Sequence, residues 1–321
     1  MVQTDRAQAG EILAIGEILI DFIVADGATT LELAESFVAR SGGAPANAAV
    51  AVARLGLPSA FCGVAGDDPL GSRLQAELAA EGVDTSRLRQ SGEAPTTLAF
   101  AWKDPGGDGH FWLIRGADTL LSDADANAAG IPSLGALVVG SVALSTQPAR
   151  SAVELAVSIA HPAGVPVVFD VNLRPTLWAD LARARPACEE VVRHSTLVKL
   201  SLDDAIGLYG LGIGPDAAIE TILNLGPQTV VLTDGERGCW FSFGSSVTFV
   251  PAFSVEAVEP TGAGDAFTAA IIARSLASDW APLSVDDVRY AAAAGALATT
   301  RPGAWDGLPN RSQLGAFLAR Q

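Results

Sequence analysis

The chain has 321 residues, with 36 acidic and 20 basic side chains and a formal net charge of −16. Such an acidic surface repels nucleic-acid phosphates and anionic membranes, so we expect neither as a partner. Hydrophobic residues make up 49% and charged residues 17% of the chain, which allows a large buried core and argues against disorder.

Three features of the sequence predict a cytoplasmic protein. Residues 1–10 are polar and show no secretory signal pattern. The three cysteines, Cys62, Cys188 and Cys239, form no CxxC pair, and their odd number fits reduced thiols. The uncharged stretch 126–149 is interrupted by glycines and prolines and is too broken to span a bilayer.

In chain order, short apolar runs alternate with longer helical patterns. A buried strand opens the chain within Ile12–Ile23, followed by helix Pro45–Leu55, strand Ala60–Val64 and helix Leu70–Ala80. Later strands are predicted near Ala136–Val139, Val165–Val171, Leu197–Leu200 and Thr229–Thr233, with helices near Pro148–Ala160, Ala179–Arg193 and Asp216–Leu225. This alternation predicts parallel strands with crossover helices, a layered α/β sandwich.

Two segments, about 22–40 and 95–116, break the alternation. In the second, the β-prone runs Thr96–Trp102 and His110–Ile114 flank a turn at 104–109. We interpret both segments as a small β-sheet lid inserted in one domain, residues 11–321; an ordinary surface hairpin is the alternative. Unpaired edges of such a lid could pair with a second copy, which favours a homodimer.

A glycine-rich loop near the C-terminus carries the strongest chemical signal. Gly262-Ala263-Gly264-Asp265 directly precedes a predicted helix, Ala266–Leu276. Glycines let a phosphate approach the backbone, and the first amides of a helix have no internal partners. Together with the helix dipole they form an anion hole that needs no lysine. Taken alone, such a motif is more often a helix cap, with Asp265 capping its own helix; the second glycine-rich element described next favours the anion hole.

A second glycine-rich element lies near the start of the chain. Ser41-Gly42-Gly43 precedes the helix that contains Asn47, whose amide suits sugar hydroxyls. The alternative is that Asn47 satisfies the backbone of its own turn.

Together with Gly16-Glu17-Ile18-Leu19-Ile20-Asp21, these loops resemble the two signatures of the PfkB (ribokinase-like) carbohydrate kinases, with fructokinases the most similar. The resemblance covers roughly residues 11–310. It implies a ribokinase-like three-layer α/β/α sandwich with a mainly parallel central sheet and a small β-sheet lid. It also implies ATP and Mg²⁺ as cofactors.

The resemblance also implies roles for individual residues. Asp265 would be the catalytic base, and the amides of Gly262, Ala263 and Gly264 would form the anion hole. The substrate-binding residues would be Asp21, Gly42, Gly43, Asn47, Arg115, Asn172 and Arg174. The nucleotide-binding residues would be Lys199, Ser201, Asp204, Thr233, Gly235, Gly238 and Gly264, with the loop Gly295–Gly303 against adenine.

Some positions depart from the family pattern. Glu259-Pro260 replaces the usual Asp-Thr, so Glu259 and Thr261 are candidate ligands for a monovalent cation, and K⁺ activation is open. Ser201 and Asp204 stand where Asn and Glu are usual. We expect Asp203-Asp204 to begin a helix, with Mg²⁺ carried by ATP.

The function these features favour is transfer of phosphate from ATP to a hydroxymethyl group of a monosaccharide, with D-fructose yielding fructose 6-phosphate. A 2-keto-3-deoxygluconate kinase or a ribokinase is the alternative. A sugar- or nucleotide-binding sensor without turnover is the alternative that is not an enzyme. We expect Asp265 to be ionised at neutral pH, because a helix N-terminus favours the charged form.

Overall fold

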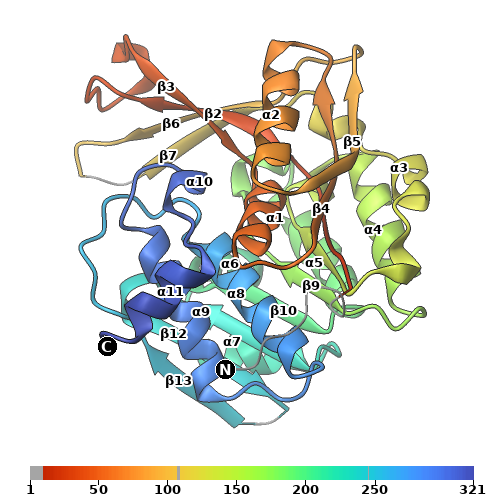
Figure 1. The fold of residues 1–321 in the computed structure, drawn as a ribbon, viewed down its shortest axis with the longest axis vertical. Helices are drawn as coiled ribbons and strands as arrows, with labels where there is room; N and C mark the ends of the chain where they lie inside the picture. Colours follow the sequence, from red (N-terminus) through yellow and green to blue (C-terminus); the bar gives the residue numbers. More distant parts are fainter. Residues whose placement is uncertain (1–9, 107–108, 245) are drawn as a thin grey trace.

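The fold, taken from a computed structural model that describes residues 10–106, 109–244 and 246–321, is a nine-stranded sheet between two helical layers (Figure 1). The strand order is β13-β12-β11-β10-β9-β8-β1-β4-β5, and neighbours from β11 to β5 pair in parallel. Strands β12 and β13 add an antiparallel edge. The predicted α/β/α sandwich with a mainly parallel sheet is confirmed.

The elements of this sandwich have the following bounds. The strands are β1 (Ile12–Ile15), β4 (Ser59–Gly66), β5 (Asp84–Ser91), β8 (Ala136–Gly140), β9 (Val167–Asp170), β10 (Leu197–Ser201), β11 (Thr229–Thr233), β12 (Gly238–Phe243) and β13 (Ser246–Pro251). One face is covered by α1 (Ala44–Arg54), α2 (Pro69–Ala80), α8 (Ala263–Ala277), α9 (Val285–Ala298), α10 (Ala304–Gly307) and α11 (Arg311–Leu318). The other is covered by α3 (Asp123–Ala128), α4 (Ala149–Ala160), α5 (Ala184–Val192), α6 (Leu202–Tyr209) and α7 (Pro215–Leu223).

Strand β1 shows why the sheet is buried on both faces. Its residues Ile12 and Ala14 enter one hydrophobic core, while Leu13 and Ile15 enter the other. Successive side chains of a strand point to opposite faces, so a strand between two helical layers must be apolar throughout. This is the continuous apolar run that the sequence shows at 12–15.

A second, four-stranded sheet lies at one end of the molecule, drawn in red to yellow at the upper left of Figure 1. It consists of β2 (Leu19–Val24), β3 (Phe37–Gly42), β6 (Leu98–Lys103) and β7 (Gly109–Ile114). Strand β2 pairs antiparallel with β3 and parallel with β6, and β6 pairs antiparallel with β7. Part of the predicted turn at 104–109, residues 107–108, lies outside the described residues. Among the helices described, none is long and apolar enough to cross a bilayer.

Candidate active site

A cavity of about 260 Å³ lies where the small sheet faces the carboxyl ends of the central strands. Open parallel sheets bind ligands at this edge. The predicted site residues that line it are Asp21, Gly43, Asn47, Asn172, Arg174, Lys199, Thr261, Gly262, Gly264 and Asp265. Segments far apart in the chain therefore meet at one place.

The glycine-rich loop Gly262–Asp265, called the anion loop from here on, differs in detail from the expectation. Helix α8 begins at Ala263 instead of Ala266, with Gly262 as its N-cap at φ 84°. The amide of Ala263 donates to Pro260 O (3.1 Å), so it is engaged within the loop. Within the described chain, the amides of Gly262, Gly264 and Asp265 have no hydrogen-bond acceptor and remain available to an anion.

The loop itself contains no lysine, but a lysine from another strand lies beside it. Lys199 Nζ, from β10, lies beside Gly264: a Cβ added at Gly264 would be 2.7 Å from it. Lys199 is buried, and its Nζ lies 3.0 Å from Oδ1 of Asp170, its register partner on the neighbouring strand β9. Thr268 donates to the other Asp170 oxygen, Oδ2. Burial opposes the ammonium charge, but nearby carboxylates, Asp170 foremost, outweigh it and raise the pKa of Lys199.

Asp265 is buried at the cavity wall and bonded to Asn47. Asn47 Nδ2 donates to Asp265 Oδ2 at 2.7 Å, and Asn47 Oδ1 accepts from Trp305 Nε1 at 2.7 Å. Both ends of the Asn47 amide are therefore engaged by protein groups. The alternative in which Asn47 satisfies its own turn does not hold.

The expectation that a helix N-terminus keeps Asp265 ionised at neutral pH left out the burial of its side chain. Burial raises the pKa of Asp265 to about 7; the charge of Asp170 adds to the rise, and Asn47, Lys199 and Arg174 oppose it. Loss of hydration outweighs the helix dipole because the side chain is 7% exposed. A carboxyl with a pKa near 7 is a stronger base than an ordinary aspartate.

Asp21, on β2, faces the same cavity. Burial raises its pKa to about 7, with Glu259 and Asp265 adding repulsion and Arg174 opposing it. A Cβ at position 42 would overlap Asp21 Oδ2, so Gly42 makes room for this carboxyl without lining the cavity itself. Gly43, at φ 104°, is the N-cap of α1 and does line it.

The loop after β9 brings a cation to the cavity. Asn172 has φ 42°, a left-handed conformation that asparagine tolerates, and the chain turns there. The Arg174 guanidinium lies 5.9 Å from the centre of the Phe111 ring of β7. Arg174 therefore links the main sheet to the small one at the cavity.

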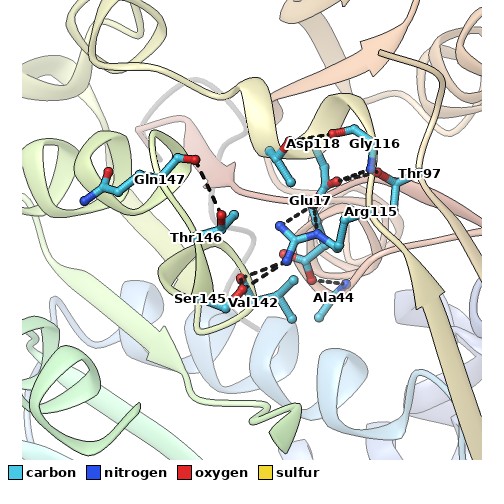
Figure 2. A network of polar contacts seen from close by, with 11 residues as sticks. Glu17, Ala44, Thr97, Arg115, Gly116, Asp118, Val142, Ser145, Thr146 and Gln147 are labelled. Atoms are coloured by element: carbon cyan, nitrogen blue, oxygen red, sulfur yellow. Dashed lines mark hydrogen bonds and ion pairs between the residues drawn. The ribbon is translucent and has the colours of Figure 1, made fainter. Parts of the chain in front are cut away.

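Arg115 is held in a network behind the cavity wall (Figure 2). Its Nε donates to Asp118 at 2.6 Å, and its Nη1 donates to Val142 O and Ser145 Oγ. Glu17 is also buried there and does line the cavity. Burial raises the pKa of Glu17 to about 7, with Arg115 opposing. Arg115 is thus engaged with the wall and is not itself among the lining residues.

Helix α6 begins at Leu202, with Ser201 as its N-cap and Asp203 and Asp204 in its first turn, so the predicted helix start at Asp203-Asp204 is observed. Ser201 Oγ accepts from the Asp204 amide, and Asp204 Oδ2 accepts from the Ser201 amide, which is a capping box. The second Asp204 oxygen accepts from the Leu173 amide at 2.7 Å. These hydrogen bonds give both residues a structural role at the start of α6. They do not support the prediction that the two residues bind the nucleotide.

Three other predicted nucleotide residues lie at the end of β11. Thr233 is the register partner of Ser201, so they share the carboxyl edge of the sheet. Gly235 (φ 49°) and Gly238 (φ 126°) shape the turn into β12, and a Cβ at Gly238 would overlap Val250 O of β13. Of the supposed loop Gly295–Gly303, the first residues belong to helix α9; Gly295 packs against Ala263.

The candidate cation ligands bond to protein groups instead. Thr261 Oγ1 donates to Glu259 Oε1 at 2.6 Å, and the Gly303 amide donates to Glu259 Oε2 at 2.9 Å. The longer glutamate thus bridges two loops directly. A cation there would compete with both hydrogen bonds, so this pair does not fit a K⁺ site as arranged. Among the residues described, no cluster of three His, Cys, Asp or Glu side chains could hold a metal.

Sequence reasoning missed several residues of the site. Glu17 stood in the motif Gly16–Asp21 without a role, and Asp170 was assigned none. Trp305 carried no signal, because its partner Asn47 is 258 residues away in the chain. Only the folded backbone brings that pair together.

The chain belongs to the pfkB family of carbohydrate kinases, whose pattern ("pfkB family carbohydrate kinase") matches residues 9–311. It is a phosphotransferase that acts on a sugar hydroxyl. It is 34% identical over 312 residues to Fructokinase-1 of Oryza sativa subsp. japonica, covering 94% of this chain and 96% of that one.

Two solved structures support the same assignment. A fructokinase from Xylella fastidiosa with bound ATP superposes with a TM-score of 0.87 at 30% identity, over 97% of this chain and 98% of that one. A fructokinase double mutant from Vibrio cholerae O395, bound to fructose, ADP and potassium ion, superposes with a TM-score of 0.86 at 32% identity, over 96% and 98%. The predicted family and the predicted similarity to fructokinases are confirmed.

Proposed function

We propose that this protein is an ATP-dependent fructokinase that converts D-fructose to fructose 6-phosphate. The observation that carries the proposal is one wall of the cavity. There the Asp265 carboxyl lies beside unpaired helix amides and the Lys199 ammonium, which is the set of groups that phosphoryl transfer to an alcohol requires. The similarity to fructokinases supports fructose as the acceptor.

Asp265 accepts the proton of the attacking hydroxymethyl group. Asn47 holds Oδ2, and Oδ1 receives no hydrogen bond from the described residues, so Oδ1 is available to the sugar. A base with a pKa of about 7 combines appreciable ionisation at neutral pH with a useful affinity for the proton.

The transferred phosphoryl group is held by charge and by backbone donors. The amides of Gly262, Gly264 and Asp265 bind its oxygens, and Lys199 and Arg174 offset its negative charge. Mg²⁺, brought with ATP, neutralises phosphate oxygens further. The adenosine end would lie over the carboxyl ends of β10 and β11, near Thr233 and Gly235.

The sugar lies between the small sheet and α1. Asp21, Gly43 and Asn172 line this part of the cavity and contact its hydroxyls. Asn47 lines it as well, with its amide bonded to Asp265 and Trp305. Arg115 and Gly42 act indirectly, by shaping the wall around Glu17 and Asp21. Strands from segments 22–40 and 95–116 act as a lid within a single domain of residues 11–321.

The test is ADP release with a panel of acceptors: D-fructose, ribose and 2-keto-3-deoxygluconate. We expect the highest kcat/KM with fructose, and Asp265→Asn should lower turnover by about 10²–10⁴. Asp286→Asn is the control, since Asp286 also lies in the first turn of a helix but is exposed and outside the cavity. A preference for another acceptor would change the substrate; fructose binding without ADP release would make the protein a sensor.

We further propose a cytoplasmic homodimer that associates through the small sheet. Two side chains on the face of β7 that points away from the cavity, Trp112 and Ile114, are 52% and 40% exposed. An apolar sheet surface of this kind favours association. Light scattering should give the mass of two chains, and Trp112→Lys should give one. A monomeric native protein would refute this arrangement.

A further inference from the structure

Trp305 lies outside the glycine-rich motifs, yet it contacts the residue that binds Asp265. Its side chain is in α10 and is 8% exposed. Its Nε1–H donates to Asn47 Oδ1, and Asn47 Nδ2 donates to Asp265 Oδ2, both at 2.7 Å. An indole N–H can only donate, so it selects the oxygen of the Asn47 amide and turns the NH₂ group toward Asp265.

Helix α10 is fixed to α1 at two points. Asn47, in the first turns of α1, accepts from the Trp305 indole. Arg54, the last residue of α1, donates to the carbonyls of Trp305 and Leu308 and also pairs with Glu81 at 2.6 Å. The indole therefore cannot shift along α1 without breaking a partly buried cluster of hydrogen bonds.

The same short helix packs on the anion loop. A Cβ at Gly262, the N-cap of α8, would lie 2.9 Å from Ala304 O, so the two backbones are in close contact. The Gly303 amide donates to Glu259, which precedes that loop. Trp305 is thus carried by a segment that is fixed relative to both Asn47 and the start of the helix that bears Asp265.

We propose that Trp305 is a positioning residue, which through Asn47 holds the Asp265 carboxylate with Oδ1 directed to the sugar hydroxyl. This inference rests on the proposed function, in which Asp265 is the base. The indole contributes by removing the alternative orientation of the Asn47 amide, in which the oxygen would face the carboxylate and repel it.

Trp305→Phe tests the inference, because it deletes the N–H and keeps an aromatic ring. Without the indole donor the Asn47 amide is free to rotate, and its hydrogen bond to the Asp265 carboxylate is lost with it. We therefore expect kcat to fall about 10-fold to 100-fold, the effect of losing one hydrogen bond to a charged group, while the KM for fructose changes little. Trp240→Phe is the matched control: that ring packs at a tilt against Phe249, 4.9 Å between ring centres, on the edge strands of the sheet and outside the cavity. Thermal unfolding of both variants shows whether the fold is retained.

The pH profile and a double-mutant cycle separate positioning from general damage. The Asn47 bond lowers the pKa of Asp265 against burial and Asp170, so its loss should move the acidic limb of kcat/KM upward by about half to one pH unit. In the Asn47→Ala background, Trp305→Phe should cause no further loss, since the two residues act through one bond.

The outcomes can be told apart from those of the proposed function. If Asp265→Asn retains turnover, the base assignment fails and Trp305 has nothing to position. If Asp265→Asn abolishes turnover while Trp305→Phe keeps wild-type kcat and pH profile, only the Trp305 inference fails. Additive losses from Trp305→Phe and Asn47→Ala would overturn it as well.

Discussion

The pH dependence of turnover follows directly from the burial of Asp265. Its pKa is raised from 3.8 to about 7. A base with this pKa is about 9% ionised at pH 6 and about 1% at pH 5, so kcat/KM for fructose should fall nearly tenfold per unit below pH 6. With an ordinary aspartate, the same profile would stay flat down to about pH 5.

The assay is ADP release at limiting fructose and saturating MgATP between pH 5 and 9. The terminal phosphate of ATP also gains a proton near pH 6, to judge from phosphate groups in general, so the residual activity of Asp265→Asn serves as the reference for the nucleotide's own titration. Asp21→Asn should move the limb to lower pH, because Asp21 and Asp265 repel each other when ionised. If the wild-type pH profile of kcat/KM had the same shape as that of Asp265→Asn, the titration of Asp265 would not be the cause and the reasoning would be refuted.

Two further changes test other contacts. Gly264→Ala places a Cβ 2.7 Å from Lys199 Nζ, so it should raise the KM for ATP about tenfold; the control Gly315→Ala meets no atom within 4 Å and should leave kinetics unchanged. Glu17 has a pKa raised from 4.5 to about 7, so its contribution to stability is complete below pH 4.5 and is lost as the pH rises through 7. In Glu17→Gln the free energy of unfolding, measured with urea, should therefore decline less between pH 5 and pH 8 than in the wild type, by about 2 to 3 kcal/mol; an equal decline would contradict a buried, protonated Glu17.

The layered fold was predictable because its determinants are local. A short run rich in β-branched residues, such as Thr229–Thr233, is typical of a strand buried on both faces, and the observed β11 has the same bounds. The glycine-rich loops were equally predictable, because a single glycine is enough to indicate a backbone conformation or a close approach that other residues disfavour. What the sequence could not supply was the distance between the loops.

The electrostatics of the site depended on that missing geometry. From the sequence, Asp265 was an acid at a helix N-terminus, which favours ionisation. In the fold it is also buried and near Asp170, and these effects raise its pKa instead. Likewise, Ser201 and Asp204 matched a family position, but only the structure shows that they cap α6 together.

The two glycines of the anion loop show how one motif can hold two separate physical requirements. Gly262 has φ 84°, which an L-residue adopts only with strain, and its missing side chain lets α10 approach. Gly264 is helical and unstrained, and what excludes a side chain there is the Lys199 ammonium. An alanine at 262 would therefore disturb the backbone and α10, whereas an alanine at 264 would displace a charge. Because the first effect acts on folding and the second on phosphate binding, the same substitution at positions two apart should separate stability from nucleotide affinity.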